Sequence, residues 1–567
     1  MVEDIPALGL AKKKKTRVKR GRKNAASTKL VVTATAKDRD HTIEIGALFA
    51  VGIVCVYFFG LARNIHSLPE PFPNNLGLMG SNINVAHPLE LEDDLSSRSS
   101  NQDDAAAQPA VVVTNSDIHI PAAQWPVSIR NEDGNFETII HPADGHTEMD
   151  VPKFWSRPVH NNGLMSRETA MKIGSCVEPD TDGNHARGEN CAKHQRTIFV
   201  GIASYRDFEC RTTVESIFLR AKYPERIRVG VVDQIVDGED PVCDAPVYPC
   251  SEKPNQALCK YKDQVDVYQM EAELSVGPVF ARHIGYRLYR GEYYATQSDA
   301  HVTFTTGWDM DIIEQMEGTG NEMTVLTTYL TDIQGSIDEK TGNSLRRTRP
   351  IMCNTIYEGG PQGLHLRHAS QPEGPPRVQG MPQLEPWWAA GYSFSRGHFI
   401  VNVPYDPLQP MIFQGEEMSI GIRGFTVGYD FYAPERSVCF HHYAIGKNAK
   451  KRNKVKHFWE NGERYPGVGK RAMSRLLGIV RMNPEKDPKE WDHTEEDIYG
   501  IGGVRSPELF YETFGIDVKK KTIEAHLCRF VDWGGKMHKA FQKHLRKDGM
   551  GIDYSKINFK FKDPEKK

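Results

Sequence analysis

Between residues 196 and 330 the chain alternates between near-continuous apolar runs and segments with helical character. Near-continuous apolar runs are typical of strands buried on both faces of a sheet, and they occupy residues 197–203, 227–233, 266–270, 293–297 and 323–330. Two segments between them are expected to be helical, 211–222 from its apolar spacing and 277–292 from the proline in its first turn. This alternation predicts an α/β sheet of Rossmann type, with parallel strands joined by right-handed crossovers.

Beyond residue 330 the pattern is less regular. Residues 332–385 are rich in Gly, Pro and Arg and show little periodicity, which predicts a long loop, and loops of that length are often functional. Residues 391–406 return to a strand-like composition. After residue 447 the chain is strongly basic and then mixed, and residues 499–516 are expected to be its most structured part.

Residues 45–62 form a run of eighteen residues without a charge. That length lies near the lower end of the ~17–25 residues that span a bilayer as a helix. A buried core helix and a secretory signal are the alternatives, but the run has no polar face and no small-residue cleavage pattern clearly follows it. Residues 1–42 hold twelve Lys or Arg against four Asp or Glu. By the positive-inside rule, this predicts a single-pass type II anchor with the remaining chain in the lumen.

Composition divides the chain into six predicted parts. In order they are a basic cytosolic tail (1–42), a transmembrane helix (43–62), an acidic stem expected to be disordered (63–125), a loop-rich transition (126–195), a catalytic domain (196–515) and a C-terminal extension (516–567).

Charge and cysteine content restrict the partners and the compartment. The formal net charge of −3 indicates no special partner, and the basic arm, taken alone, fits a nuclear signal or a nucleic-acid arm. Beside a membrane span, retention or orientation explains the arm more simply, so no nucleic-acid partner is predicted. Nine of the ten cysteines follow the span, from Cys176 to Cys528. In a lumenal compartment some should pair, and at least one is left over.

Polar side chains follow three of the predicted strands. They are Ser204 and Arg206, then Asp233, then Asp299 and His301. In open α/β sheets, ligands bind beyond the carboxyl ends of the strands. Asp299 and His301 lie two residues apart, so in an extended segment they point to the same side. A carboxylate and an imidazole together suit Mn²⁺ with positions open for phosphate oxygens, whereas the simpler interpretation is a turn with an Asx hydrogen bond.

Histidine and arginine side chains elsewhere would complete such a site. His441 and His442 follow another apolar run, and one of them is expected to face the site while the other faces away. Arg282 lies in the early turns of the helix from 277, whose N-terminus favours anions. It either contacts a phosphate or is a solvated helix residue.

Two further pairs of neighbours are candidates for the acceptor side. Glu416 and Glu417 follow a glycine and either line a pocket, where one would orient a hydroxyl, or lie on an exposed helix. Trp387 and Trp388 lie beside small residues and either pack against a sugar or acceptor chain or belong to the core.

As a set, these residues resemble a known family. The motifs SYRDFEC, VVDQ, GPVFAR, QSDAHVTF…GWD, VPYDP…FQGEE, GYDFYAP, HHY and YGIGGVR occur in this order between Ser204 and Arg505. They resemble the polypeptide α-N-acetylglucosaminyltransferase family over residues 196–515. The resemblance implies a GT-A fold, a UDP-GlcNAc donor, Mn²⁺ and retention at the anomeric carbon. Retention is drawn as a front-face attack in which the leaving phosphate oxygen takes the acceptor proton, with a covalent route through a glutamate as the alternative.

The resemblance also assigns roles to individual residues. Asp299 and His301 correspond to the family's Asp-x-His metal and diphosphate motif. His441, rather than His442, matches its H-x-Y ending, because Tyr443 then falls in place. The other assignments are Ser204, Arg206 and Asp233 around the nucleotide, Arg282 near the diphosphate, and Glu416 and Glu417 near the acceptor.

The predicted function is transfer of GlcNAc to a Thr, Ser or hydroxyproline hydroxyl of a polypeptide acceptor. Some family members are soluble and cytoplasmic, whereas this chain carries an apparent anchor, which favours the Golgi or another secretory-pathway membrane. Alternatives are another UDP-sugar, a glycan acceptor, or a non-catalytic binding protein on the same fold. A metal-dependent phosphoesterase also uses Asp-x-His, but the chain has no GDxxD pattern for a second metal.

Overall fold

The computed structural model describes residues 163–557, apart from 180–184, 361, 445–446, 466 and 525, and the backbone of four earlier strands. Those strands are β1 (Ile118–Ile120), β2 (Pro126–Arg130), β3 (Phe136–Ile140) and β4 (Met149–Val151), paired as β1–β4 and β2–β3. All of these residues belong to one compact unit, 104–567. Within the described ranges, no helix combines the length and apolar character needed to cross a bilayer. The predicted anchor, 43–62, lies outside them.

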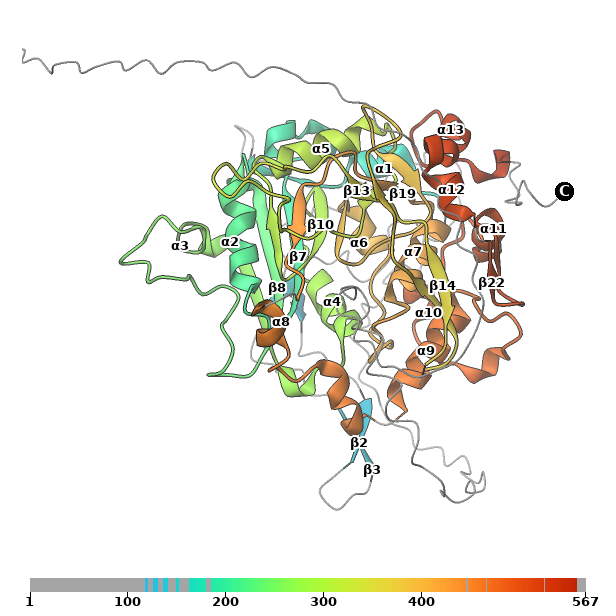
Figure 1. Ribbon diagram of the computed structural model, residues 1–567, viewed down its shortest axis with the longest axis horizontal. Coiled ribbons are helices and arrows are strands. Elements are labelled where there is room, and N and C mark those ends of the chain that lie inside the picture. The colour runs from blue at the N-terminus through green and yellow to red at the C-terminus, as the bar shows by residue number, and fades with distance from the viewer. Residues whose placement is uncertain are drawn as a thin grey trace, which may run out of the picture. The chain divides into compact units, whose positions relative to one another are not determined.

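An eight-stranded sheet forms the centre of this unit (Figure 1), in the order β17-β19-β12-β18-β10-β7-β8-β9. Its strands are β7 (Ile198–Tyr205), β8 (Ile227–Ile235), β9 (Val265–Glu271), β10 (Tyr294–Asp299), β12 (Thr324–Thr327), β17 (Gln383–Glu385), β18 (Tyr392–Arg396) and β19 (Asp430–Ala433). β10, β7, β8 and β9 are parallel neighbours, so their carboxyl ends share one edge. β18 runs antiparallel between β10 and β12. The predicted α/β class is confirmed, and the sheet is mixed.

Five helices pack around this sheet or connect its strands. They are α2 (Cys210–Arg220), α4 (Pro278–Tyr286), α5 (Trp308–Gly318), α6 (His398–Asn402) and α7 (Glu416–Val427). α4 packs on β7 and β8, and its Phe280 and Ile284 share an apolar cluster with Val232. α2 and α5 are joined by the Trp308 indole, which donates to the Ile217 carbonyl at 2.9 Å.

Two elements differ from their predicted extents. The helix predicted over 277–292 ends at Tyr286, because the chain then turns through Gly291 (φ 97°) into β10. The strand-like segment 391–406 splits into β18 and α6 at Gly397. A Cβ at Gly397 would lie 2.0 Å from the Tyr289 hydroxyl oxygen, so this junction requires a glycine.

The predicted loop 332–385 contains short strand pairs. β13 (Arg349–Pro350) pairs with β16 (Glu373–Gly374), and β14 (Thr355–Glu358) pairs with β15 (His365–His368). A further pair outside the main sheet joins β11 (Val302–Phe304) to β20 (Cys439–His441). This last pair brings two distant parts of the chain to the edge of the main sheet.

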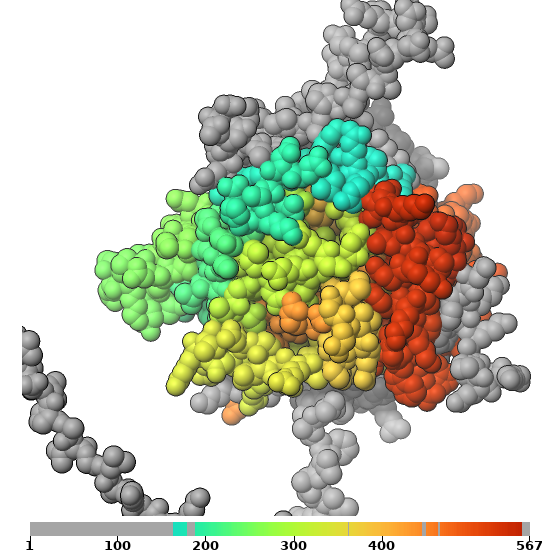
Figure 2. All heavy atoms as spheres, turned by 90° about the horizontal axis from the view of Figure 1, so that it is seen from above, coloured from blue at the N-terminus to red at the C-terminus, as the bar shows by residue number. Residues whose placement is uncertain are grey.

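The C-terminal residues pack on the same unit. α11 lies against α7 and α13 lies against β17. Figure 2 shows the C-terminal segment, in red, directly beside the yellow segment that precedes α6. The remaining elements are α1 (Arg167–Met171), α3 (Ala257–Lys260), α8 (Lys447–Arg452), α9 (Val468–Ile479), α10 (Glu496–Tyr499), α11 (Pro507–Thr513), α12 (Leu527–Val531), α13 (Lys536–Phe541), β5 (Ser175–Pro179), β6 (His185–Arg187), β21 (Ile516–Asp517) and β22 (Thr522–Ile523).

Eight of the nine cysteines after the predicted anchor form disulfides. The pairs are Cys176–Cys191, Cys210–Cys243, Cys250–Cys259 and Cys353–Cys528. Cys439 is a buried free thiol. The prediction that some cysteines pair and at least one is left over is confirmed.

Candidate active site

β10 delivers the predicted Asp299 and His301 to the carboxyl edge of the parallel strands. The strand is buried until Asp299, its last residue. His301 precedes β11, and β11 pairs with β20 so that Val302 lies opposite His441. The candidate ligand atoms of Asp299, His301 and His441 therefore all lie within 4.8 Å of one another. The structure brings these three residues together, although Asp299 and His441 are 142 positions apart in the sequence.

The geometry of this cluster fits one divalent cation. One carboxylate and two imidazoles are a donor set that Mn²⁺ accepts. The rings of His301 and His441 are perpendicular, with centroids 4.3 Å apart, and the His441 Nε2 is 3.6 Å from an Asp299 oxygen. His442 is turned toward Thr303 instead, with its Nε2 2.7 Å from the hydroxyl. His441, and not His442, is therefore the histidine that faces this cluster.

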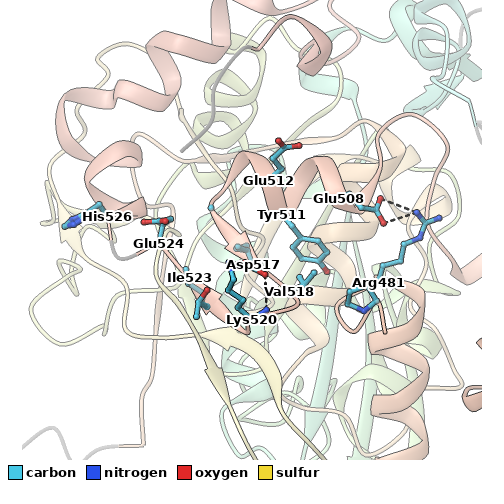
Figure 3. A pocket seen from close by; sticks show the side chains of 14 residues that line it. Arg481, Glu508, Tyr511, Glu512, Asp517, Val518, Lys520, Ile523, Glu524 and His526 are labelled. Atoms are coloured by element: carbon cyan, nitrogen blue, oxygen red, sulfur yellow. Dashed lines mark hydrogen bonds and ion pairs between the residues drawn. The ribbon is translucent and has the colours of Figure 1, made fainter. Parts of the chain in front are cut away.

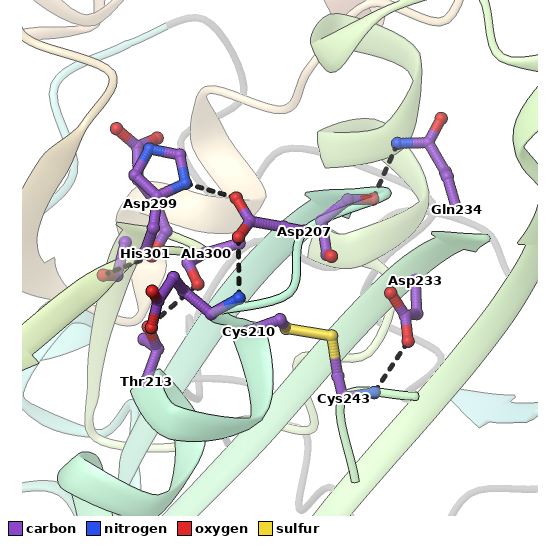
Figure 4. Close-up of a disulfide and its surroundings, with 12 residues drawn as sticks. Asp207, Cys210, Thr213, Asp233, Gln234, Cys243, Asp299, Ala300 and His301 are labelled. Atoms are coloured by element: carbon purple, nitrogen blue, oxygen red, sulfur yellow. Dashed lines mark hydrogen bonds and ion pairs between the residues drawn. A yellow bond between two sulfur atoms is a disulfide. The ribbon is translucent and has the colours of Figure 1, made fainter. Parts of the chain in front are cut away.

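Asp207 holds the imidazole of His301 in place. One Asp207 oxygen lies 2.5 Å from the His301 Nδ1 (Figure 4), and the Arg452 guanidinium lies 3.2 Å from the same oxygen. The other oxygen accepts the Glu209 amide at 2.9 Å, which ties Asp207 to the start of α2. With Nδ1 donating to Asp207, the Nε2 of His301 is left as the acceptor nitrogen. Sequence reasoning named no role for Asp207, although it lies in the polar turn after β7.

Arg282 connects the cluster to Glu416. Its Nη2 lies 2.9 Å from an Asp299 oxygen, and its Nη1 contacts Glu416. The Tyr405 hydroxyl also donates to Glu416, at 2.7 Å. Burial alone would raise the pKa of Asp299, but the nearby His441 imidazole and the Arg282 charge hold it well below its usual range. Arg282 is thus a fixed cation beside a carboxylate that stays ionised.

The two adjacent glutamates have different surroundings. The Glu416 side chain is 3% exposed and enclosed by its partners, whereas that of Glu417 is 20% exposed. The Tyr329 hydroxyl donates to Glu417 at 2.9 Å, and so does the Ala390 amide. Burial raises the pKa of Glu417 to about 7, although these two donors oppose the shift. Glu417 is therefore the accessible carboxyl group, and it titrates near neutral pH.

Ser204 and Asp233 lie near the carboxyl ends of neighbouring strands and opposite each other in the β7–β8 register. Both are buried. An Asp233 oxygen accepts the Cys243 amide at 2.8 Å, and Cys243 is disulfide-bonded to Cys210 at the start of α2 (Figure 4). Burial raises the pKa of Asp233 to about 6. Because both sulfurs are in the disulfide, they are not available as ligands beside this carboxylate.

Arg206 faces the loop that follows β8. Its Nε lies 2.6 Å from an Asp240 oxygen, and its Nη2 lies 2.7 Å from Glu239. Its backbone has a positive φ of 48°, which turns the chain sharply after β7. Arg206, which was predicted to lie around the nucleotide, is therefore near the expected edge of the sheet, and two carboxylates hold its guanidinium group.

The tryptophan prediction is corrected by the structure. Trp387 and Trp388 are both 0% exposed. Trp387 packs against Phe510, with ring centroids 5.0 Å apart, and Trp388 packs beside Gly421 of α7. Neither ring has a surface to offer a sugar or an acceptor chain, because Trp387 packs against α11 and Trp388 packs against α7.

A cavity of about 770 Å³ lies elsewhere, between α11 and the β21–β22 hairpin (Figure 3). Its walls carry the ion pairs Arg481–Glu508 at 3.0 Å and Lys520–Asp517 at 3.1 Å. None of the residues predicted from sequence lines it. Four acidic and two basic side chains line it, and none of them belongs to the cluster at the β10 edge.

Comparisons with known proteins place this site within a matched region. The model of a glycosyltransferase (GlcNAc) family matches residues 197–257 and 246–520. A search of curated proteins gives no match. Among solved structures, GalNAc-T7 with UDP, GalNAc and Mn²⁺ is 16% identical over 59% of this chain and 59% of that chain, with a TM-score of 0.37. S. aureus TarS in complex with UDP-GlcNAc is 11% identical over 52% of this chain and 68% of that one, with a TM-score of 0.28.

Proposed function

The chain belongs to the glycosyltransferase (GlcNAc) family, and we propose that it transfers GlcNAc from UDP-GlcNAc to a hydroxyl group of a polypeptide. The observation that carries the proposal is the convergence of Asp299, His301 and His441 at the carboxyl edge of the sheet, inside the matched region. Ligands of open α/β sheets bind at this edge. Ser204 and Asp233 lie near the carboxyl ends of β7 and β8 at the same edge, as expected of residues around a nucleotide.

The three clustered residues would hold the divalent cation. Bound there, it would supply positive charge to the diphosphate as that group leaves. Arg282 adds a cation that does not depend on metal, fixed between Asp299 and Glu416. His301 is oriented by Asp207, so its acceptor nitrogen is preset before any ligand arrives. Each of these contacts prepares the site for an anionic leaving group.

Glu417 is the carboxyl group best suited to meet the acceptor. Its partial exposure allows its carboxylate to accept a hydrogen bond from the acceptor hydroxyl and so orient it, and its raised pKa places the ionisation that this requires near neutral pH. Glu416 acts instead by holding Arg282. For a retaining transfer, we favour the front-face route, in which the new glycosidic bond forms as the bond to phosphate breaks and the acceptor proton passes to the phosphate oxygen. A covalent intermediate on Glu417 is the second candidate, and it rests on that residue's exposure.

The direct test is release of UDP and labelled transfer from UDP-GlcNAc, with and without Mn²⁺. Asp299→Ala is expected to lose both transfer and Mn²⁺ dependence while keeping the wild-type circular dichroism spectrum. Asp263→Ala, an exposed carboxylate before the amino end of β9, is the matched control and should keep full activity. An Asp299→Ala variant with wild-type transfer would refute the assignment.

We also propose that the protein is a type II membrane protein of the secretory pathway with a lumenal catalytic domain. The four disulfides support an oxidising compartment. In sealed microsomes, the catalytic domain should resist added protease until detergent is present. Digestion without detergent would place it on the cytosolic side and rule the proposal out.

A further inference from the structure

Exposed aromatic side chains gather near the starts of α4 and α7. Phe413 is 60% exposed and Trp459 is 54% exposed. The Phe413 and Phe458 ring centroids are 6.2 Å apart, those of Phe458 and Trp459 are 5.3 Å apart, and His457 stacks on Trp459 at 4.3 Å. We call these four residues the aromatic patch. Phe458 itself is 8% exposed, and its ring contacts both exposed rings, Phe413 and Trp459. Exposed aromatic groups that are held together in this way mark a candidate binding surface.

The aromatic patch adjoins two elements of the candidate active site. Phe458 packs against Gly277, the residue before α4, and a Cβ at Gly277 would lie 2.8 Å from its ring. α4 carries Arg282. Phe413 lies three residues before Glu416, at the start of α7. A molecule lying across the patch would therefore extend toward the residues around Arg282.

The patch also meets the turn that orients His301. The Tyr205 ring is 6.4 Å from Phe458, and its hydroxyl donates to the Lys456 carbonyl at 2.9 Å. Two residues further on, Asp207 contacts His301. The aromatic patch and the reactive cluster are thus joined by one short turn.

A strongly basic segment borders the patch on its N-terminal side. Residues 447–457 contain six Lys or Arg and no Asp or Glu. Lys450, Lys454 and Lys456 are exposed, and the Lys451 ammonium lies 4.5 Å from the Phe208 ring centroid. Arg452, at the end of α8, lies 3.2 Å from Asp207, so this segment also contacts the turn after β7. A positive border next to an aromatic surface selects a partner with negative charge.

We propose that the aromatic patch and the basic segment together dock an acidic polypeptide segment that carries the acceptor hydroxyl. The inference rests on the proposed function and names its substrate class. Rigid aromatic rings contact a polypeptide over a large area at low entropic cost, and the lysines would favour Asp or Glu beside the modified residue. Single-stranded nucleic acid also fits aromatic and basic groups, but continuity with the active site of a glycosyltransferase favours the acceptor. The strand β2 contacts the helical turn Phe458–Arg464. An acceptor bound on the aromatic patch would therefore lie next to the β2–β3 pair.

The test uses the full-length protein and three fluorescent peptides of equal length with one central Thr, flanked by Asp and Glu, by Gly and Ser, or by Lys. The wild type should bind and glycosylate the acidic peptide with at least a tenfold lower KM than the others. The double variant Phe413→Ala/Trp459→Ala should raise the KM for that peptide about tenfold or more, with the loss in the peptide KM and not in the KM for UDP-GlcNAc. Lys454→Glu/Lys456→Glu should abolish the preference for negative charge.

Trp533→Ala is the matched control, because Trp533 is 56% exposed and lies outside the patch. It should leave the peptide KM unchanged. If no UDP-GlcNAc is turned over at all, the proposed function fails, and fluorescence anisotropy of the acidic peptide still tests the docking surface. Equal affinity for the three peptides, no binding of the acidic one, or tighter binding of a thymidine oligonucleotide would each overturn the inference. An equal loss in Trp533→Ala would do so as well.

Discussion

Replacing Asp233 by Asn should make the protein more stable at neutral pH. Asp233 is buried at the end of β8, and burial raises its pKa from 3.8 to about 6. The folded state therefore pays to ionise a carboxyl group that the unfolded chain ionises freely. Asn has nearly the same shape, can still accept the Cys243 amide, and carries no charge.

The magnitude follows from the difference between the folded and unfolded pKa. A shift of about two units, at ~1.4 kcal/mol per unit, costs about 3 kcal/mol once the group is fully ionised. The folded pKa is the higher one, so the cost is absent below about pH 4, where Asp233 is protonated in both the folded and the unfolded state. The free energy of unfolding then falls as the pH rises through about 6 and the folded protein has to ionise this group. Asp233→Asn should then exceed the wild type by up to about 3 kcal/mol at pH 7.5 and by little at pH 4.

Urea unfolding at the two pH values measures this difference. Asp237→Asn, an exposed position in the loop after the same strand, is the control and should change stability little at either pH. If Asp233 also meets the nucleotide, the KM for UDP-GlcNAc should rise in the same variant that gains stability. No gain at pH 7.5, or an equal gain at pH 4, would refute the reasoning, because burial of an ionised group would then not be the cause.

Two further predictions concern the reactive cluster. Asp207→Asn should weaken Mn²⁺ binding about 10- to 100-fold, because His301 loses its orienting carboxylate. Asp207→Glu should restore part of the Mn²⁺ affinity. A lowered melting temperature with an unchanged Mn²⁺ titration would indicate a merely structural role. Glu417→Gln should lower kcat about 100-fold and abolish the fall in wild-type activity below about pH 7, where the carboxylate takes up a proton. A variant with the wild-type pH profile would show that ionised Glu417 does not orient the acceptor hydroxyl.

The elements that sequence predicts well are those with a strong local pattern. The apolar runs at β7, β8 and β10 require burial on both faces, and such runs place their last polar residue at the sheet edge. This reasoning places Asp299 and His301 at the sheet edge, whereas their role as metal ligands also depended on the family resemblance. The antiparallel β18 between β10 and β12 does not, because strand order depends on pairings between distant segments, which no local period encodes.

The hydrogen-bond partners of Glu416 and Glu417 could not be predicted from the sequence for the same reason. Tyr405 reaches Glu416 from the segment 391–406, and Tyr329 reaches Glu417 from the segment 323–330. Both segments have a strand-like pattern, and such a pattern does not show which distant side chain a residue contacts. Trp387 and Trp388 lie beside small residues in the sequence, but a distant small residue, Gly421 of α7, allows that helix to pack against Trp388. A short side chain beside a large one fits a pocket and a tightly packed core equally well, so composition could not separate the two.

The roles of Glu416 and Glu417 separate through helix geometry. Successive residues of an α-helix point about 100° apart, so two adjacent carboxylates at the start of α7 cannot face the same neighbours. The first turns inward to Arg282 and Tyr405, where it keeps a cation in place. The second turns toward Tyr329 and the Ala390 amide, with part of its surface open. One Gly-Glu-Glu element thereby supplies both an internal counter-ion and an accessible carboxyl group, because Gly415, at φ 100°, precedes the first residue of the helix.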